Sequence, residues 1–254
     1  MKRIDVVGFG PGGYEYMTIQ AIAAMRSADV IVGYRTYVDL LRGIFPDKNF
    51  LDTPMTKEVE RCKIALKEAM KGQQVALVSC GDSGIYGMAG IMLQVVQASE
   101  EDIPVRIIPG VTAACAGASM LGAPLMNDFS IISLSDLMVP LSKILLRVKC
   151  AAEGDFVICL YNPKSRKRKE HLEKAVDIIR NFRQPETPVG LVRRAGRENS
   201  ACEMTTLKKL KNAKVDMFTV VIIGNSMTYV RDGKMITPRG YVLEEVGQWL
   251  YIVS

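Results

Sequence analysis

Two glycine-rich segments, each directly after an apolar run, could bring backbone atoms close to a small ligand. Residues 8–13 (GFGPGG) follow the apolar run Ile4–Val7, and residues 79–87 (SCGDSGIYG) follow Val75–Ser79. Ligands of open α/β sheets gather at the carboxyl ends of strands, where glycine allows close backbone approach. Asp82 in the second segment could bind a ribose hydroxyl or an amino group, or it could cap the helix that follows.

The first segment matches the GxGxxG pattern of dinucleotide-binding proteins. That fingerprint also needs an acidic residue at the end of the second strand, where it binds the ribose hydroxyls. Here the second predicted strand, Val30–Val32, continues into Gly33 and Tyr34, and Asp29 precedes it. Pro11 also removes one backbone N–H from a phosphate-binding turn. The pattern therefore disfavours a nicotinamide oxidoreductase, and a structural tight turn stays as the other interpretation.

Three further segments with polar or charged side chains lie at the ends of predicted strands. They are residues 109–114 (PGVTAA), 160–168 (LYNPKSRKR) and 193–199 (RRAGREN). Thr112 could contact a ligand or simply begin a helix. The cations within residues 164–169 could form an anion site, although a solvated helix face is the more ordinary interpretation. The arginines of the third segment favour bidentate contacts with carboxylates.

The composition limits the classes of protein that fit. Of 254 residues, 48% are hydrophobic and 24% charged, and the net charge is +6. This mixture is typical of a globular protein with a sizeable core and excludes a disordered chain. No apolar run is long enough for a transmembrane helix, and Asp5 interrupts the short apolar start, which disfavours a secretory signal. Six scattered cysteines without a CxxC pair, with His171 as the single histidine, predict reduced, mostly buried thiols and no metal site.

Strand-like and helix-like segments alternate along the chain, which predicts an α/β fold with a mainly parallel first sheet. The predicted strands are Ile4–Val7, Val30–Val32, Val75–Ser79, Val105–Ile108, Ser130–Leu134, Phe156–Tyr161, Val189–Val192 and Phe218–Ile223. The predicted helices are Met17–Ser27, Lys57–Lys71, Gly84–Ala98, Val139–Ala151 and Arg166–Asn181. Asp232-Gly233, near the end, predicts a hairpin turn. The small-residue segment 109–128 predicts close packing and a junction between an N-terminal α/β domain, 1–115, and a C-terminal α/β domain, 116–254.

The order of these segments resembles the tetrapyrrole methylase family over nearly the whole chain. GFGPG, CGDSGIYG, PGVTAA, LYNPKS and VRRAGREN occur in the family's order and at family-like spacing. Residues 29–38 (DVIVGYRTYV), 125–136 (LMNDFSIISLSD) and 160–168 look most like the members that act on precorrin-3B or cobalt-factor III in cobalamin biosynthesis. For such members the resemblance implies methyl transfer from S-adenosylmethionine to C17, with contraction of the macrocycle.

The resemblance also implies that S-adenosylmethionine binds, folded up, in a cleft between the two α/β domains. Carried over position by position, the implied cofactor contacts are Pro11, Cys80, Gly81, Asp82, Ile85, Thr112, Ala113, Asn162 and Gly196. The protein's main tasks would be to align the two reactants and to exclude water. No metal ion is needed by the protein, and cobalt would enter only as part of the substrate.

Substrate binding and proton transfer are less clearly implied. The substrate carries several carboxylates, so arginines are its natural partners, namely Arg168, Arg193 and Arg197. Some relatives place an aspartate after the second strand as a base, where this chain has Gly33-Tyr34, so that base cannot be carried over. The candidates for proton transfer are Tyr34, Ser135, Asp136 and Asp128.

The alternatives within the superfamily are a different precorrin methylase or a ribosomal RNA methylase. An RNA enzyme should spread basic and aromatic residues over one surface. Here the cations cluster at residues 164–169, and aromatic residues make up 7% of the chain. The expected partner is therefore a tetrapyrrole polycarboxylate, with no nucleic acid and no membrane. The resemblance further implies a cytoplasmic homodimer.

Overall fold

The structure is a computed structural model that describes residues 2–165 and 167–241. The chain forms two compact units. Of the described residues, the first unit comprises 2–116 together with 194–200, and the second comprises 117–165, 167–193 and 201–241. The short segment 194–200 therefore belongs to the first unit, although both of its neighbours in the chain belong to the second.

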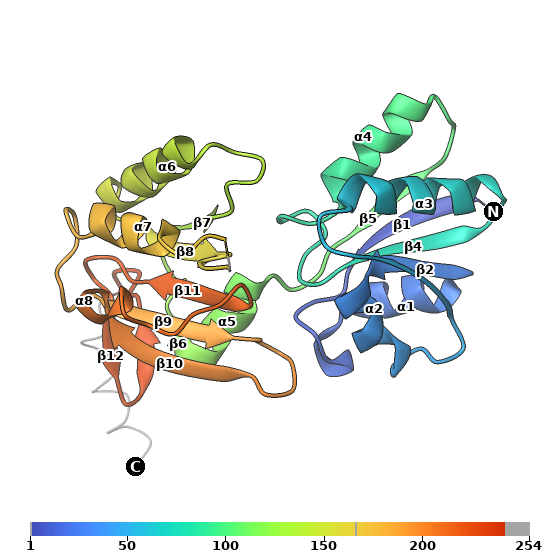
Figure 1. The fold of residues 1–254 in the computed structure, drawn as a ribbon. Helices are drawn as coiled ribbons and strands as arrows, with labels where there is room; N and C mark the ends of the chain where they lie inside the picture. The colour runs from blue at the N-terminus through green and yellow to red at the C-terminus, as the bar shows by residue number, and fades with distance from the viewer. Residues whose placement is uncertain (1, 166, 242–254) are drawn as a thin grey trace, which may run out of the picture. The chain divides into compact units, whose positions relative to one another are not determined.

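A five-stranded parallel sheet forms the centre of the first unit (Figure 1). In spatial order its strands are β3 (Asn49–Thr53), β2 (Val30–Tyr34), β4 (Gln74–Ser79), β1 (Arg3–Gly8) and β5 (Val105–Ile108). A dinucleotide-binding sheet pairs its first two strands directly, whereas here β4 lies between β1 and β2. The chain therefore lacks the βαβ unit that GxGxxG serves in nicotinamide enzymes, and this topology argues against an oxidoreductase.

Helices cover both faces of this sheet (Figure 1). The helices α3 (Glu58–Met70) and α4 (Ala89–Ser99) cover one face, and α1 (Ile19–Ser27) and α2 (Arg35–Arg42) cover the other, after the short 3-10 turn η1 (Tyr14–Tyr16). Alternate residues of a strand point to opposite faces, so Val6 packs with α3 and α4 while Val7 packs with α1. Two buried faces explain why the central strands β1, β2 and β4 are nearly continuous apolar runs.

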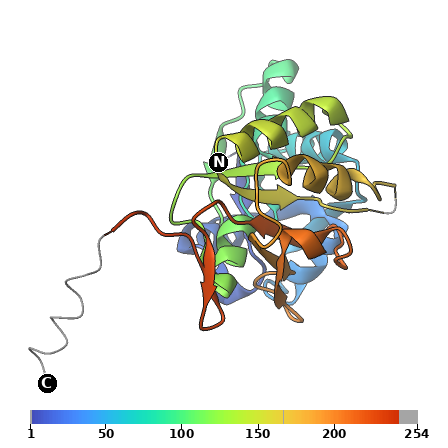
Figure 2. The same cartoon turned by 90° about the vertical axis from the view of Figure 1, so that its left-hand side faces the viewer.

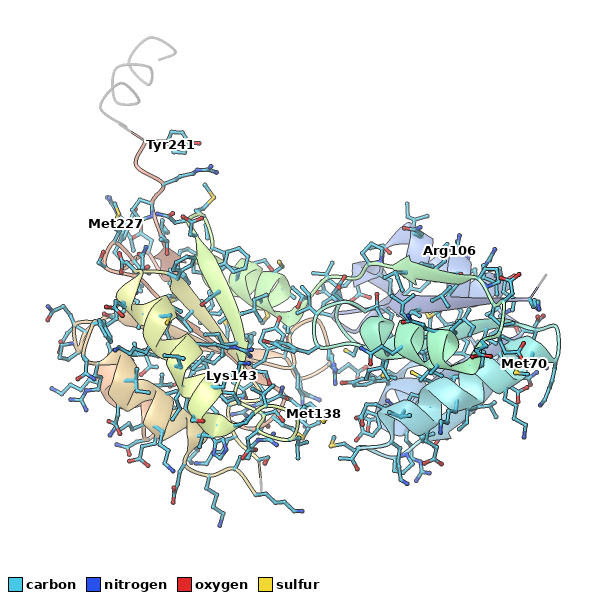
Figure 3. All side chains as sticks on the ribbon, turned by 90° about the horizontal axis from the view of Figure 1, so that it is seen from above. Met70, Arg106, Met138, Lys143, Met227 and Tyr241 are labelled. Atoms are coloured by element: carbon cyan, nitrogen blue, oxygen red, sulfur yellow. The ribbon has the colours of Figure 1, made fainter. Side chains whose placement is uncertain are left out.

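A buried carboxylate interrupts the apolar pattern of β1. Asp5 in β1 is fully buried, and its two carboxylate oxygens accept hydrogen bonds from Nε and Nη2 of Arg106, both at 2.9 Å. Arg3 lies 3.0 Å from the same carboxylate. Arg106 is labelled in Figure 3. A buried carboxylate is tolerated here because two guanidinium groups compensate its charge.

The second unit contains a mixed five-stranded sheet. Its order is β10 (Ala201–Thr206), β9 (Pro188–Arg193), β11 (Thr219–Ile223), β8 (Val157–Tyr161) and β7 (Phe129–Ser133). β7 and β8 are parallel, and the other neighbours are antiparallel. The helices α6 (Leu141–Glu153), α7 (His171–Ile179) and α8 (Leu207–Leu210) share an apolar core with this sheet. The carboxyl ends of β7, β8 and β9 consequently lie at one edge.

The small-residue helix α5 (Ala113–Leu121) packs closely against the second sheet, as its composition predicts. A Cβ on Gly117 would lie 2.8 Å from Cγ1 of Val220, so only glycine fits there without a shift. The predicted hairpin, drawn in red in Figure 2, is also confirmed: β12 (Tyr229–Arg231) pairs with β13 (Lys234–Ile236). On its other side β13 pairs in parallel with β6 (Gly122–Ala123). Asp232 and Gly233 both have positive φ, as a type I′ turn requires.

Two predicted helices begin later than expected, and the cysteine prediction is wrong in part. The helix expected from Gly84 begins at Ala89, because residues 81–88 form a loop held by Asp82. The helix expected from Arg166 begins at His171, because Ser165 Oγ caps a turn by accepting from Arg168 N at 3.1 Å. Arg166 itself lies outside the described residues. The cysteines expected to be mostly buried include three exposed ones, Cys115, Cys150 and Cys202.

Candidate active site

Backbone hydrogen bonds tie together the loops that follow β1, β4 and β5. Gly10 N donates to the carbonyl of Gly81 at 3.0 Å, and Val111 N donates to the carbonyl of Gly10 at 3.3 Å. A Cβ on Gly10 would lie 2.1 Å from the α-carbon of Gly81, and one on Gly110 would lie 2.3 Å from the Gly81 oxygen. Glycines are therefore needed here so that the three loops can pack on one another at the carboxyl edge of the sheet.

The same edge leaves room for a ligand beside Gly81. Its φ is +85°, and among the described residues a Cβ there would meet only the α-carbon of Thr112, at 3.9 Å. A ligand could therefore approach the backbone between Cys80 and Asp82, as expected for a cofactor contact. Ile85 is 37% exposed on the same loop, and Thr112 is nearly buried directly before Ala113 at the start of α5.

Asp82 has a structural task in addition to any ligand contact. Its Oδ1 accepts from Gly84 N at 2.8 Å, and its Oδ2 accepts from Gly110 N at 3.0 Å. One carboxylate thus shapes its own loop and ties it to the loop after β5. The helix-cap alternative is wrong, because the N-cap of α4 is Met88. Each carboxylate oxygen has a second lone pair with which it can accept from a ligand.

The segment 194–200 packs directly on the loop after β1. Gly13 N donates to the carbonyl of Gly196 at 2.9 Å. A Cβ on Gly196 would lie 2.2 Å from Cγ of Pro11, and Gly196 has a φ of +66°. The predicted cofactor residues Pro11 and Gly196, far apart in sequence, are therefore in contact.

Arg197, expected to bind substrate carboxylates, instead faces a predicted cofactor residue. Its Nη2 donates to Cys80 Sγ at 2.8 Å, and Sγ donates to the carbonyl of Pro11 at 3.3 Å. Burial raises the pKa of the Cys80 thiol above its ordinary value, and the Arg197 guanidinium partly offsets that rise. A neutral thiol can donate to Pro11 while accepting from Arg197, which accounts for both contacts.

The aromatic cluster Phe9, Tyr34 and Tyr37 lies beside these loops. The Tyr34 and Tyr37 rings meet edge to face with centres 5.1 Å apart, and Phe9 meets Tyr37 at 6.1 Å. Arg197 lies 5.9 Å from the Tyr37 ring centre. Burial raises the pKa of Tyr37 to about 12, so its hydroxyl stays protonated at neutral pH. Tyr37 is a candidate the sequence analysis missed, although it stands in the segment GYRTYV that the analysis singled out.

The second unit holds Asn162 and Ser135 at the carboxyl edge of its own sheet. Asn162, after β8, donates from Nδ2 to Ser133 Oγ at 2.9 Å. Ser135 N, after β7, donates to the same hydroxyl at 3.2 Å. Asp128 precedes β7 and so lies at the opposite edge of this sheet from Ser135. This separation argues against Asp128 as a proton-transfer group.

Asp136 contacts the chain's single histidine. His171 Nε2 lies 3.0 Å from Asp136 Oδ2, an ion-pair distance although the direction is poor for a hydrogen bond. The contact with His171 lowers the pKa of the exposed Asp136 carboxyl below its ordinary value. A carboxylate with a lowered pKa is a weak base. Asp136 therefore suits holding a charge or a position better than accepting a proton.

The two other arginines expected at the substrate also lie in the second unit. The backbone N–H and C=O of Arg168 bond to Ser165, while its buried Nε has no hydrogen-bond partner within the described residues. Arg193 ends β9, donates to the carbonyl of Lys214 at 3.0 Å and lies 3.9 Å from Asp216. Arg168 thus keeps an unused donor for an anion, whereas Arg193 is already engaged by its own unit.

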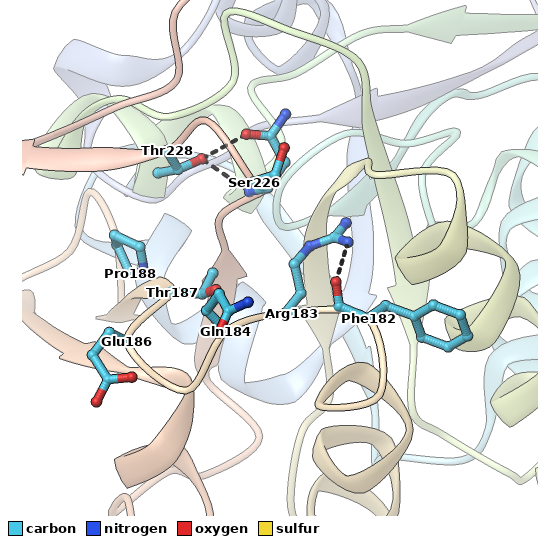
Figure 4. Close-up of a pocket in the computed structure, with 9 residues that line it drawn as sticks. Phe182, Arg183, Gln184, Glu186, Thr187, Pro188, Ser226 and Thr228 are labelled. Atoms are coloured by element: carbon cyan, nitrogen blue, oxygen red, sulfur yellow. Dashed lines mark hydrogen bonds between the residues drawn. The ribbon is translucent and has the colours of Figure 1, made fainter.

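A cavity of about 280 Å³ lies at the other edge of the second sheet, near the start of β9 and the end of β11 (Figure 4). It is lined by Phe182, Arg183, Gln184, Glu186, Thr187, Pro188, Asn225, Ser226 and Thr228. None of these is a predicted site residue. Within the described residues, no cluster of three or more metal-binding side chains occurs, and no helix has the length and apolarity needed to span a membrane.

Comparison with known proteins agrees with this arrangement. Residues 3–211 match the family model of tetrapyrrole (corrin/porphyrin) methylases, so the chain belongs to this family of S-adenosylmethionine-dependent methyltransferases. A Salmonella typhimurium protein described as a probable cobalt-factor III C(17)-methyltransferase is 50% identical, over 94% of this chain and 100% of that protein.

Other relatives are more distant or longer. A precorrin-3B C(17)-methyltransferase from Sinorhizobium is 37% identical over 93% of this chain and 96% of that protein. The chain spans 45% of a cobalt-factor III methyltransferase from Priestia megaterium, at 44% identity. The crystal structure of the methyltransferase CobJ superposes with a TM-score of 0.87 at 33% identity, covering 94% of this chain and 100% of that one. The predicted α/β fold and the family resemblance are confirmed.

Proposed function

We propose that the chain transfers a methyl group from S-adenosylmethionine to C17 of a corrin precursor, with ring contraction, in cobalamin biosynthesis. The observation that carries the proposal is the full-length match to the Salmonella protein, whose described activity is the C17 methylation of cobalt-factor III. Identity is 50% to that protein and 37% to the precorrin-3B enzyme. This difference favours a cobalt-containing substrate over a metal-free one.

The first unit supplies the binding groups that this activity needs. When bound, S-adenosylmethionine supplies an electrophilic methyl group for in-line displacement by a substrate carbon. The backbone at Gly81 is open to a ligand, and the Asp82 carboxylate has lone pairs that can accept hydrogen bonds from it. Pro11, which contacts both Cys80 and Gly196, lies in the neighbouring loop. These are the residues we propose to hold the cofactor, together with Ile85, Thr112, Ala113 and, from the second unit, Asn162. Loops tied together in this way would favour the reaction by holding the methyl donor in a fixed orientation toward the substrate carbon.

Proton transfer during ring contraction is proposed to involve a tyrosine hydroxyl rather than a carboxylate. A phenol hydroxyl can donate a proton to the substrate or orient it by a hydrogen bond. Tyr34 ends β2 at the carboxyl edge of the sheet that carries the cofactor loops. Tyr34→Phe should therefore lower kcat more than it raises KM, since a group acting only in the transition state affects kcat.

The decisive assay incubates the purified chain with S-adenosylmethionine and cobalt-factor III and analyses the product by mass spectrometry and NMR. One added methyl group at C17 with a contracted macrocycle supports the proposal. Methylation at another carbon, or of a ribosomal RNA fragment supplied in parallel, would assign the chain to another branch of the family. We also propose, from the family resemblance, that the enzyme is a cytoplasmic homodimer, which light scattering of the purified protein and cell fractionation can test.

A further inference from the structure

The carboxyl edge of the first sheet has two halves. The loops after β4, β1 and β5 carry the proposed cofactor contacts, whereas β2 and β3 end at Tyr34 and Thr53 in the other half. Arg61, from helix α3, lies over this second half, with its guanidinium carbon 5.9 Å from the centre of the Tyr34 ring. No sequence motif draws attention to this arginine.

Arg61 is a buried cation whose hydrogen-bond partners are all neutral. Its side chain is enclosed, with 4% of the residue exposed. Nε donates to Thr53 Oγ1 at 2.9 Å, Nη2 to the carbonyl of Pro54 at 3.1 Å, and Nη1 to Met88 Sδ at 3.5 Å. Within the described part of the chain it forms no ion pair, and Glu58 supports its charge only from a greater distance.

An uncompensated buried charge is costly for the free protein, so it indicates a function for that charge. A guanidinium has five N–H donors, and the contacts above leave two of them for another acceptor. Burial lowers the pKa of Arg61, as expected for a cation that has lost water without gaining an anion. A carboxylate would supply both the missing charge and the missing acceptor.

The tyrosines next to Arg61 fit the rest of such a ligand. The Tyr34 and Tyr37 rings pack edge to face, and within the described residues neither hydroxyl makes a hydrogen bond. Their half-buried rings offer an apolar surface, and the Tyr37 hydroxyl offers a donor to the bound substrate. A flat macrocycle carrying carboxylates needs this combination of aromatic surface, polar groups and a fixed cation.

We propose that Arg61, with Tyr34 and Tyr37, binds a carboxylate side chain of the tetrapyrrole substrate. The proposal rests on the proposed function and adds the position of the substrate to it. The methyl donor would occupy the half of the edge formed by β4, β1 and β5, and the acceptor the half formed by β2 and β3. Tyr37 joins the two halves, because its ring also contacts Phe9 of the loop after β1.

The test compares Arg61→Met, which keeps the length of the side chain without its charge, with Arg61→Lys, which keeps the charge. Arg26→Met is the matched control, since Arg26 also faces a tyrosine ring, Tyr14, at 6.0 Å, but on an exposed surface of the same unit. The probes are uroporphyrin, a polycarboxylate porphyrin, coproporphyrin, which has fewer carboxylates, and S-adenosylhomocysteine. Binding is measured by porphyrin absorbance and by calorimetry, and KM and kcat are measured with cobalt-factor III.

Arg61→Met should weaken uroporphyrin binding and raise the substrate KM roughly tenfold or more, the usual effect of losing a charge-assisted contact. Its kcat and its affinity for S-adenosylhomocysteine should stay unchanged. Arg61→Lys should recover part of the lost uroporphyrin affinity, and Arg26→Met should bind and turn over like wild type. The affinity of Arg61→Met for coproporphyrin should fall less than its affinity for uroporphyrin. Unchanged porphyrin binding by a folded Arg61→Met protein overturns the proposal, and so does an equal loss of S-adenosylhomocysteine binding, which marks a structural role.

If Arg61→Met does not fold, Tyr34→Leu takes its place. This variant removes the aromatic surface beside Arg61, so it should bind uroporphyrin more weakly and S-adenosylhomocysteine as tightly as wild type. Unchanged uroporphyrin binding by this variant rejects the proposal. Failure of the proposed function looks different. In that case the wild-type protein neither binds uroporphyrin nor methylates cobalt-factor III, and the inference about Arg61 is rejected with it.

Discussion

The guanidinium of Arg197 donates to the thiol of Cys80, with 2.8 Å between Nη2 and Sγ, although the two residues are 117 positions apart in the chain. The contact joins the segment 194–200 to the loop after β4, within the first unit. Arg197 also faces the Tyr37 ring. This position associates Arg197 with the proposed cofactor loops more than with substrate carboxylates.

Replacing Arg197 by methionine should therefore weaken S-adenosylhomocysteine binding more than it raises the substrate KM. Because Arg197 lowers a thiol pKa that burial has raised, its loss should raise the pKa of Cys80 further. Cys80 should then react even more slowly with iodoacetamide at mildly alkaline pH, since only the thiolate reacts. Peptide mapping of the alkylated protein measures this, with exposed Cys150 as the internal reference. A raised KM with normal cofactor affinity would instead support the substrate role expected from the sequence.

The contact between the loops after β1 and β4 leads to a second prediction. Gly10→Ala places a Cβ 2.1 Å from the backbone of Gly81, so one loop must move. We expect S-adenosylhomocysteine binding to be lost or strongly weakened while the unit stays folded. Gly90→Ala is the control, because within the described residues nothing lies within 4 Å of the added Cβ in α4. That variant should raise stability by about 0.5–1 kcal/mol. Calorimetry and thermal unfolding compare the two, and normal cofactor affinity in Gly10→Ala would contradict the prediction.

The sequence predicted the central strands of the first sheet, β1, β2 and β4, well because both faces of those strands are buried. Val30 and Val75 begin continuous apolar runs, which need no tertiary information to recognise. β3 and β10 were not predicted, since they are partly exposed and polar residues interrupt their apolar pattern. The late start of α4 was also missed, because the loop before it depends on Gly110, a residue distant in sequence from Asp82.

The candidate site likewise contains residues that the sequence could predict and residues that only tertiary contacts bring together. Loop glycines and Asp82 belong to motifs with fixed spacing, so their common edge could be expected. The approach of the segment 194–200 to Pro11 could not, because it depends on how the chain returns from the second unit to the first. Arg61 stands in an ordinary amphipathic helix, and only its burial beside Thr53 and Tyr34 distinguishes it.

Asp82→Ala should reduce both cofactor affinity and stability. The substitution removes the acceptor for Gly84 N and for Gly110 N. A lost charge-assisted hydrogen bond typically costs about 1.5–3 kcal/mol, so S-adenosylhomocysteine affinity should fall roughly tenfold or more. Asp29→Ala is the matched control, because Asp29 also accepts a backbone N–H, that of Gln74, at the opposite edge of the same sheet. Titration calorimetry of both folded variants decides, and unchanged affinity in Asp82→Ala would remove Asp82 from the cofactor site.

Asp136 should not be the group whose titration limits activity. Its pKa is lowered by contact with His171, so it remains a carboxylate throughout the neutral range. A carboxyl with a lowered folded-state pKa stabilises the fold above its ordinary pKa of about 3.9, and this contribution is lost as the pH falls through the lowered value. Asp136→Asn should leave the shape of the kcat profile at neutral pH unchanged. The free energy of unfolding of this variant should be lower than that of wild type at neutral pH, and the difference should disappear in acid. Loss of a limb of the neutral kcat profile would restore Asp136 as a proton-transfer candidate.

Arg183, which lines the cavity in Figure 4, should matter for stability and not for catalysis. Its guanidinium donates to the carbonyls of Ala152, in the last turn of α6, and of Phe156, and lies 3.0 Å from Asp155. Arg183→Met removes the guanidinium hydrogen bonds to these two carbonyls, and a lost hydrogen bond to a charged group costs about 1.5–3 kcal/mol. Urea unfolding should show this loss, while kcat and KM of the folded protein stay normal because the cavity lies at the edge of the second sheet away from Asn162. Arg180→Met, an exposed neighbour, should be neutral in both measurements. A catalytic defect in a folded Arg183→Met protein would show that this cavity takes part in the reaction.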